Sequence, residues 1–565
     1  MKKILDNVKY IDIAFALFVL VYFFYNFFKY TVNIPVSDDY GVIDNFTDII
    51  EANSFKDKLT LFYHQHNEHR ILYDKIWFYI SYMMNDSGLN FNFLSFIGNL
   101  SLVGLVIFYY LKFRKEFSNY FLLFPLAALF LNLAFWENLT FSMASLCNFT
   151  FVLFAVISLH YLTKKETSNK DLFLSLLFFL FAMFTQGGGI FIFPVALLVL
   201  GYKKDKKQFI KYLVFAGVLM ALYFVDFTKP ESPKLADIIS NAFLHLKFFL
   251  SFLGNAFANN NFFPDNSPEA ILRSSIFGIL IFMFYIFVFI RKYYKQNLFN
   301  FSVMTLIVGI SFVTAINRLS QGETTSIASR YRLISILFLV CILIYILEFF
   351  KQKKYKWQFS NAILIAVSAA YLFLFNFNGT NEWQLSFRQR ASMYGALNFF
   401  SGDVSLLNSG GPEHDAAIMV KAKNSEVFIL NEKMIDDYYG FSKPNELNSI
   451  GNDGSVGDIT KVENVKKLKD SYFIDGYAML QQLDAKEQKV YVILSNNEKQ
   501  TVFLAKNEFR PGLSVYFDVP NSDEGAFHAR IKNEDISSGK NEISILIQNQ
   551  GKSKIIKTDQ ILTKE

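Results

Sequence analysis

Two neighbouring carboxylates stand in the loop that follows the first hydrophobic segment. They are Asp38 and Asp39, within the sequence SDDY at 37–40. A carboxylate can accept the proton of a hydroxyl group while that oxygen forms a new bond, which is the work of a general base. The same pair could instead form a solvated turn that caps the following helix. We predict that one of the two is a catalytic base.

A second polar cluster follows in the same loop. It comprises His64, His66, Glu68, His69 and Arg70, so that three of the seven histidines fall within six residues. These side chains could contact sugar hydroxyls, bind a phosphate or ligate a divalent metal. A zinc site needs three or four converging ligands, which the spacing HxHxxH does not establish. We predict substrate binding and assign no metal or other cofactor; a divalent ion and a polar interfacial helix are the alternatives.

Arginines are concentrated in a third stretch, NRLSQGETTSIASRYR at 317–332. Arginine forks match the oxygens of a phosphate group, and preorganised cations stabilise a leaving group that gains negative charge. We predict that Arg318, Arg330, Tyr331 and Arg332 hold a lipid phosphate. Lipid-headgroup binding and pairing with Glu323 are the alternatives.

Two short turns between apolar segments carry further polar residues. Trp136, Glu137 and Asn138 form one turn, and Gln186 precedes three glycines in the other. We predict that all four contact the substrate. Tryptophan anchoring at a membrane interface and a helix break required for packing are the alternatives.

The elements that must position these residues are hydrophobic helices. The chain is 52% hydrophobic and its mean hydropathy is +0.26, which excludes an ordinary soluble protein. Apolar runs of about 20 residues are long enough to cross a bilayer as helices. We predict about eleven spans, at 11–32, 92–111, 119–135, 143–162, 171–185, 188–202, 208–227, 270–290, 297–316, 331–350 and 359–377.

Lysine and arginine clusters follow every second span and predict the orientation. Examples are Lys112 to Lys115, Lys164 to Lys170 and Lys203 to Lys207. Because cytoplasmic loops are enriched in these residues, the amino terminus is predicted inside and all the candidate residues outside. The net charge of +6 therefore reflects orientation, and we predict no nucleic-acid partner. Cys147 and Cys341 both lie in apolar runs and indicate no disulfide framework.

The composition also predicts the domains. Residues 1–380 form a transmembrane catalytic domain with large outer loops at 33–91 and 229–269, the second containing a surface helix at 235–257. Residues 381–414 form an amphipathic helix and linker. Short β-type runs beginning with AAIMVKA predict an extracytoplasmic β-sandwich at 415–565. The fold class is a mainly α polytopic membrane protein with a β-rich carboxyl-terminal domain.

The chain resembles the GT-C superfamily of polytopic glycosyltransferases. SDDY at 37–40 matches the position of that family's acidic motif in the first large outer loop, and ASRYR at 328–332 precedes a late span. The resemblance implies inverting transfer of a sugar from a polyprenyl-phosphate-linked donor to a glycan, lipid or protein acceptor. It also implies a bacterial cytoplasmic membrane. Both aspartates match the motif, so the resemblance does not choose between them; Asp38 is the one nearer the predicted span.

Two other classes of protein fit parts of the pattern. O-antigen ligases and polymerases have many spans, but they place their large functional loop late in the chain. Transporters and lipid flippases place polar groups near the bilayer midplane and often contain repeated halves. Here the polar residues gather at one predicted surface and no repeat is visible, so we favour the glycosyltransferase.

Overall fold

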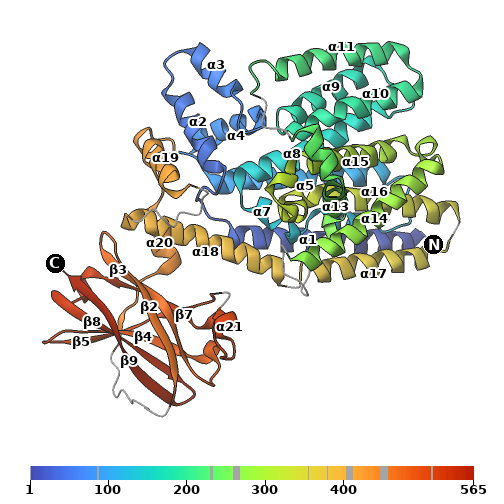
Figure 1. The fold of residues 1–565 in the computed structure, drawn as a ribbon. Helices are drawn as coiled ribbons and strands as arrows, with labels where there is room; N and C mark the ends of the chain where they lie inside the picture. Colours follow the sequence, from blue (N-terminus) through green and yellow to red (C-terminus); the bar gives the residue numbers. More distant parts are fainter. Residues whose placement is uncertain are drawn as a thin grey trace. The chain divides into compact units, whose positions relative to one another are not determined.

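The chain folds into a helical unit and a β-rich unit. The structure, a computed structural model, describes residues 2–85, 88–228, 233–258, 267–353, 355–377, 379–402, 411–445, 456–510 and 513–564. The helical unit contains 1–392 and 408–429, and the β-rich unit contains 393–407 and 430–565 (Figure 1). The first of the three boundaries between them along the chain falls within the helix α18 (Thr380–Ser401).

Seven helices are long and apolar enough to cross a membrane within the described residues. Their cores are α1 (Lys2–Tyr30), α5 (Phe91–Phe113), α8 (Ser142–Leu162), α14 (Pro268–Ile290), α15 (Leu298–Arg318), α16 (Arg332–Gln352) and α17 (Trp357–Phe375). This confirms the prediction of several membrane-type helices. The number eleven stays a prediction.

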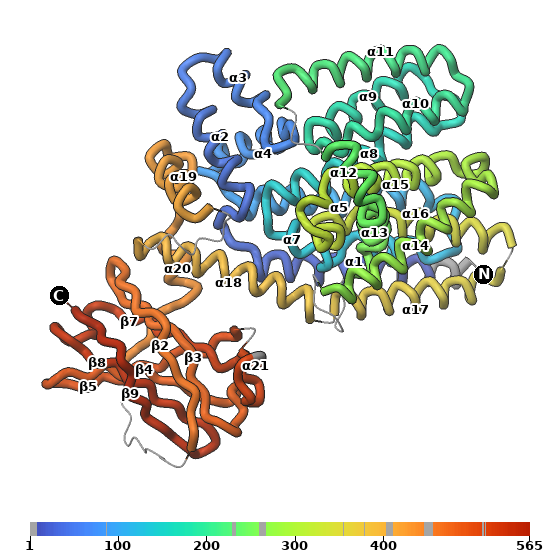
Figure 2. Tube along the Cα trace, viewed as in Figure 1, coloured from blue at the N-terminus to red at the C-terminus, as the bar shows by residue number. Residues whose placement is uncertain are grey.

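The other predicted spans are also helical, but they are shorter or less apolar. They are α6 (Leu123–Phe130), α9 (Asn169–Met183), α10 (Ile192–Lys203) and α11 (Lys206–Tyr223). A 3-10 turn, η2 (Gly187–Phe191), separates α9 from α10, because the glycine run interrupts the apolar sequence there. Figure 2 shows α9, α10 and α11 running side by side.

The first large loop folds into three short helices. They are α2 (Asp39–Glu51), α3 (Phe55–Tyr63) and α4 (Leu72–Met84). A tight turn at 66–69 joins α3 to α4, with the backbone N–H of His66 donating to the carbonyl of His69 at 2.8 Å and the reverse bond at 2.9 Å. The loop is therefore an ordered structure rather than a solvated connection.

A late segment of the chain packs on this loop. Helix α19 (Pro412–Asn424) lies beside α2 (Figure 1), and Lys421 Nζ is 2.6 Å from Asp44 Oδ1 and 2.7 Å from Asp48 Oδ1. The prediction of a strand at AAIMVKA, within α19, is wrong. Proline at the first helical position, acidic residues in the first turn and lysines in the last turn stabilise a helix there.

The second large loop is helical where it is described. It contains α12 (Leu235–Ser240), α13 (Ala242–Leu253) and the 3-10 turn η3 (Asn255–Phe257), as the apolar spacing predicted. Residues 229–232 and 259–266 of that loop lie outside the described residues.

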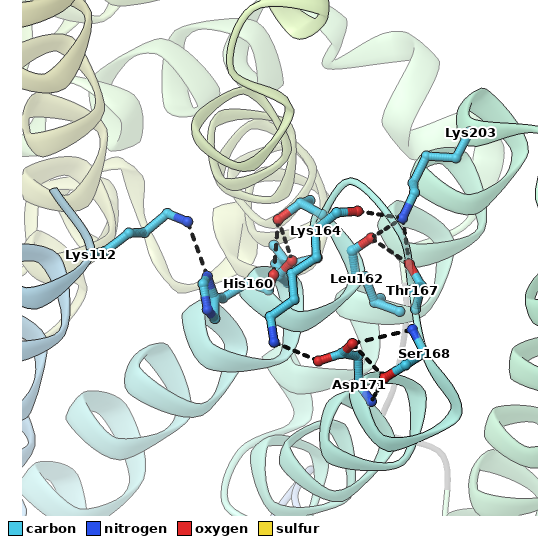
Figure 3. A network of polar contacts seen from close by, with 10 residues as sticks. Lys112, His160, Leu162, Lys164, Thr167, Ser168, Asp171 and Lys203 are labelled. Atoms are coloured by element: carbon cyan, nitrogen blue, oxygen red, sulfur yellow. Dashed lines mark hydrogen bonds and ion pairs between the residues drawn. The ribbon is translucent and has the colours of Figure 1, made fainter. Parts of the chain in front are cut away.

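A network of lysines lies where the helices α5, α8 and α10 end (Figure 3). Lys112 Nζ at the end of α5 lies 3.0 Å from His160 Nδ1 near the end of α8. Lys164 Nζ is 2.5 Å from Asp171 Oδ1, and Lys203 Nζ at the end of α10 donates to the carbonyl of Lys164 at 2.6 Å. Two of the predicted cytoplasmic clusters thus contact each other through Lys203 and Lys164, and Lys112 of a third contacts His160.

The β-rich unit is a pair of antiparallel sheets. Their strand orders are β1-β5-β4-β8-β9 and β2-β3-β7-β6. The strands are β1 (Pro444–Asn445), β2 (Asp458–Lys467), β3 (Ser471–Leu480), β4 (Lys489–Ser495), β5 (Gln500–Leu504), β6 (Lys506–Glu508), β7 (Ala526–Lys532), β8 (Gly539–Asn549) and β9 (Lys552–Lys564). Ile474, Val492, Phe503 and Ile545 belong to the buried core shared by both sheets. This confirms a two-sheet carboxyl-terminal β domain, although its strands begin later than 415.

Candidate active site

The two aspartates of SDDY have different environments. Asp39 is 1% exposed. Its Oδ1 accepts from Ser142 Oγ at 2.5 Å and from the backbone N–H of Met143 at 3.0 Å, and its Oδ2 accepts from the backbone N–H of Val36 at 3.1 Å. Because Ser142 and Met143 form the first turn of α8, Asp39 fastens the loop to the start of that helix. Burial raises the pKa of Asp39 to about 6, although these three hydrogen bonds oppose the rise.

Asp38 is the exposed member of the pair. It occupies the residue before α2 and makes no capping hydrogen bond with its side chain. Ser37, which precedes it, has a φ of 51° and turns the chain sharply at this point. The carboxylate lies within electrostatic range of His69 and Arg330. It is therefore available to a ligand, whereas the carboxylate of Asp39 is occupied.

His69 connects the first loop to the glycine-rich turn. Its Nδ1 accepts from the backbone N–H of Gly187 at 3.3 Å. Burial lowers the pKa of His69 to about 4, although Asp38 acts in the opposite direction. A neutral imidazole whose Nδ1 accepts must carry its proton on Nε2. A β-carbon at position 187 would lie 2.8 Å from Nδ1, so glycine is required for this approach.

Glu68 ties the same turn to the end of α15. Its carboxylate forms an ion pair with the guanidinium of Arg318. His69 Nε2 is 3.8 Å from Glu68 Oε1. The turn at 66–69 thus brings the predicted substrate-binding histidine together with one of the predicted phosphate-binding arginines.

The turn at 136–138 holds the backbone of Arg330. The backbone N–H of Arg330 donates to Glu137 Oε2 at 2.8 Å, and its carbonyl accepts from Asn138 Nδ2 at 3.0 Å. Both bonds hold the backbone of Arg330, and its side chain is exposed. Tyr331 and Glu137 lie within electrostatic range of its guanidinium. The ring centroid of Tyr331 lies 5.3 Å from the Arg330 guanidinium.

A chain of side-chain amides connects this turn to Gln186. Gln186 Nε2 donates to Asn148 Oδ1 at 3.4 Å, and Asn148 Nδ2 donates to Asn138 Oδ1 at 3.2 Å. The sequence prediction did not include Asn148. The signal that could have identified Asn148 was its position as an amide within the apolar run 143–162, because polar groups in such segments mark functional sites.

Arg388 is a further residue that the prediction left out of the site. Its guanidinium donates to the carbonyl of Glu137 and lies 5.5 Å from the ring centroid of Trp136. Helix α18 therefore contributes to the same cluster as the turn at 136–138. Its sequence indicated only an amphipathic helix.

Two of the predicted binding arginines are buried and directed at the protein itself. Arg332 is 0% exposed and donates to the carbonyl of Ala134 at 2.7 Å and to Asn255 Oδ1 at 3.1 Å. Arg70 is 2% exposed, and its Nε donates to the carbonyl of Tyr223 at 2.6 Å. These contacts hold α16 and α11 to neighbouring segments.

The side chains of the other two histidines of the cluster, His64 and His66, do not share the environment of His69. His64 is exposed at the end of α3. His66 is partly buried beside Gly41, and its Nε2 has no hydrogen-bond partner within the described residues. Among all the residues that the structure describes, no group of three or more His, Cys, Asp or Glu side chains is arranged to hold a metal ion.

The protonation of His69 gives the first prediction. Because burial lowers its pKa to about 4, we expect its imidazole to stay neutral from pH 8 down to about pH 5. Histidine-selective NMR of the intact protein in detergent, with His69→Gln to assign the signal, measures this. A midpoint near 6.5 would show a solvated imidazole and contradict the site described above.

No family model, curated protein or solved structure matches the chain. A functional conclusion must therefore come from the chemistry of the site.

Proposed function

We propose that this chain is a membrane glycosyltransferase. It would transfer a sugar from a polyprenyl-phosphate-linked donor to a glycan, lipid or protein acceptor. The observation that carries the proposal is an exposed carboxylate, Asp38, within electrostatic range of an exposed arginine, Arg330. General base and leaving-group cation are the two groups that such a transfer requires.

Asp38 is assigned the role of general base. It takes the proton of the acceptor hydroxyl while that oxygen attacks the anomeric carbon of the donor. The bond from the anomeric carbon to the phosphate oxygen breaks, and the lipid phosphate departs with the electron pair. Attack from the face opposite to the leaving group inverts the anomeric centre.

Arg330 and Arg318 are assigned to the departing phosphate. The backbone of Arg330 is held on both sides, which limits the region that its exposed guanidinium can reach. Arg318 is paired with Glu68, and a phosphate would compete with that carboxylate. Arg332 and Arg70, whose donors are directed at protein oxygens, are positioning residues in this proposal.

His69, Gln186 and Asn148 are assigned to the sugar. Neutral His69 offers a donor at Nε2, and the amides offer both donors and acceptors. Such groups suit the hydroxyls of a neutral sugar ring. The amide chain to Asn138 fixes the directions of Gln186 and Asn148, and the bond from Gly187 fixes that of His69, as ligand specificity requires.

Seven helices that are long and apolar enough to cross a membrane support the proposed membrane setting. In the proposal they cross a bacterial cytoplasmic membrane, with the network of lysines inside and Asp38 outside. The opposite placement of these two groups along α5 and α8 supports the common orientation. Phe91 at the start of α5 donates to Asn33 Oδ1 at 2.8 Å, near SDDY, while Lys112 lies at the other end of the helix.

The proposal is tested by following both substrates in liposomes. The purified protein is reconstituted with polyprenyl-phosphate sugars that carry a radiolabelled sugar, and with envelope extracts as the acceptor source. We expect label to move to the acceptor while free polyprenyl phosphate accumulates one for one. Translocation of intact donor across the bilayer without release of polyprenyl phosphate would show a flippase and overturn the proposal.

A further inference from the structure

A pocket lies beside the turn at 66–69, between α3 and the segment that follows α11. Its volume is ≈ 310 Å³, at the lower end of the range for small-molecule sites. Its lining includes Thr60, Tyr63, His64, Asn67, Asp226 and Thr228. None of the hydrogen bonds of the proposed transfer step uses this pocket.

The walls of the pocket are fastened to each other. Gln65 Oε1 accepts from the backbone N–H of Thr228 at 2.9 Å, and Gln65 Nε2 donates to the carbonyl of Thr228 at 2.9 Å. Arg70 donates to the carbonyls of Tyr63, Tyr223 and Val225, which lie on both sides of the pocket. The cavity is therefore preformed, and a ligand would not have to order the two segments on binding.

The chemistry of the lining selects the class of ligand. Among the lining residues that the structure describes, Arg70 is the one Lys or Arg, and its three donating nitrogens are directed at carbonyls. Asp226 is exposed, and its carboxylate accepts no hydrogen bond from any residue in the described ranges. An anionic phosphate would find no cationic donor that is not already directed at a carbonyl among these residues, and it would meet the carboxylate of Asp226. Hydroxyls or an amine would find a carboxylate, an amide and two threonine hydroxyls as partners.

The pocket adjoins the turn that carries His69, and His69 lies within electrostatic range of the proposed base Asp38. Asn67 lines the pocket, and the next two residues, Glu68 and His69, are the ones that contact Arg318 and Gly187. We infer that the pocket binds a saccharide, neutral or amine-bearing, as the acceptor subsite of the proposed transferase. As an acceptor subsite the inference rests on the proposed function; as a saccharide site it does not.

Ligand-observed NMR on the full-length protein in detergent tests the inference without any donor. The probes are methyl glucoside, methyl glucosaminide and glucose 1-phosphate at millimolar concentration. We expect saturation transfer to the first two and none to the third. Asp226→Asn should weaken the binding of methyl glucosaminide about tenfold, since a hydrogen bond to a charged group is lost.

Two further variants separate pocket occupancy from a folding defect. Thr60→Trp fills the pocket and should remove both signals, whereas Leu59→Trp, on the same helix but outside the lining, should keep them. The melting temperature of each variant is measured alongside. Equal transfer to glucose 1-phosphate, persistence of the signals in Thr60→Trp, or no signal from any probe would overturn the inference.

The outcome is independent of the transfer chemistry. Asp38→Asn should bind both saccharide probes as the parent protein does. If that variant also transferred sugar at the parent rate, the proposed function would fail while the saccharide site stood. If the probes failed to bind while Asp38→Asn abolished transfer, the site would fail and the proposed function would stand.

Discussion

Replacing Asp38 with asparagine should reduce sugar transfer by about 10²–10⁴-fold, the usual contribution of a general base. Asparagine keeps the shape of the side chain but cannot take up the acceptor proton. The melting temperature should not change, because Asp38 is exposed and makes no capping hydrogen bond. Initial rates in liposomes and thermal unfolding in detergent measure the two quantities.

Asp39→Asn is the matched control. Its amide nitrogen would face one of the backbone N–H groups that Asp39 now accepts from, at Val36 or Met143. A buried donor facing another donor costs about 1–3 kcal/mol, so we expect a lower melting temperature and a smaller loss of rate in the folded protein. An inactive but thermally normal Asp39→Asn protein beside a fully active Asp38→Asn protein would assign the base to Asp39.

The second large effect concerns Arg330. Arg330→Ala should lower transfer by about 10²–10³-fold, as does the loss of one preorganised donor to a developing charge. Arg330→Lys should recover little, since an ammonium group cannot bind two phosphate oxygens as a planar fork does. The backbone contacts of Arg330 with Glu137 and Asn138 do not involve the guanidinium, so the fold should persist.

Arg332→Lys is the comparison two residues away. Its guanidinium is 0% exposed and donates to Ala134 and Asn255. Losing those bonds leaves buried acceptors without partners, at about 1–3 kcal/mol each, so its melting temperature should fall. If Arg330→Lys and Arg318→Lys both keep the parent turnover, these arginines are headgroup anchors and a different group must bind the leaving phosphate.

The amino-acid sequence by itself determined the class of protein and the segregation of its polar groups. Charged side chains are costly in hydrocarbon, so apolar runs of about 20 residues alternate with polar connections whatever the packing. The lysine clusters of α5, α8 and α10 and the polar motifs accordingly lie at different ends of the helices. The short β-type runs predicted from residue 415 onward likewise indicated a β-sandwich, and a two-sheet β domain is present although its strands begin later.

Local pattern was insufficient at AAIMVKA. Apolar residues in a run that short suit a strand or a helix equally. The contacts of α19 with α2, including Lys421 with Asp44 and Asp48, join segments more than 370 residues apart. Sequence spacing contains no record of such contacts.

Only the tertiary structure decided between neighbours of the same type. Asp38 and Asp39 are adjacent and chemically identical, but Ser142 and Met143, 103 and 104 residues further along the chain, bind one and leave the other exposed. Arg330 and Arg332 differ in a similar way. Glu137 accepts from the backbone N–H of Arg330, whereas Ala134 and Asn255 accept from the guanidinium of Arg332. Hydrogen bonds between distant segments determine which donor or acceptor is used up and which remains for a ligand, because a buried polar group must be paired while an exposed one need not be.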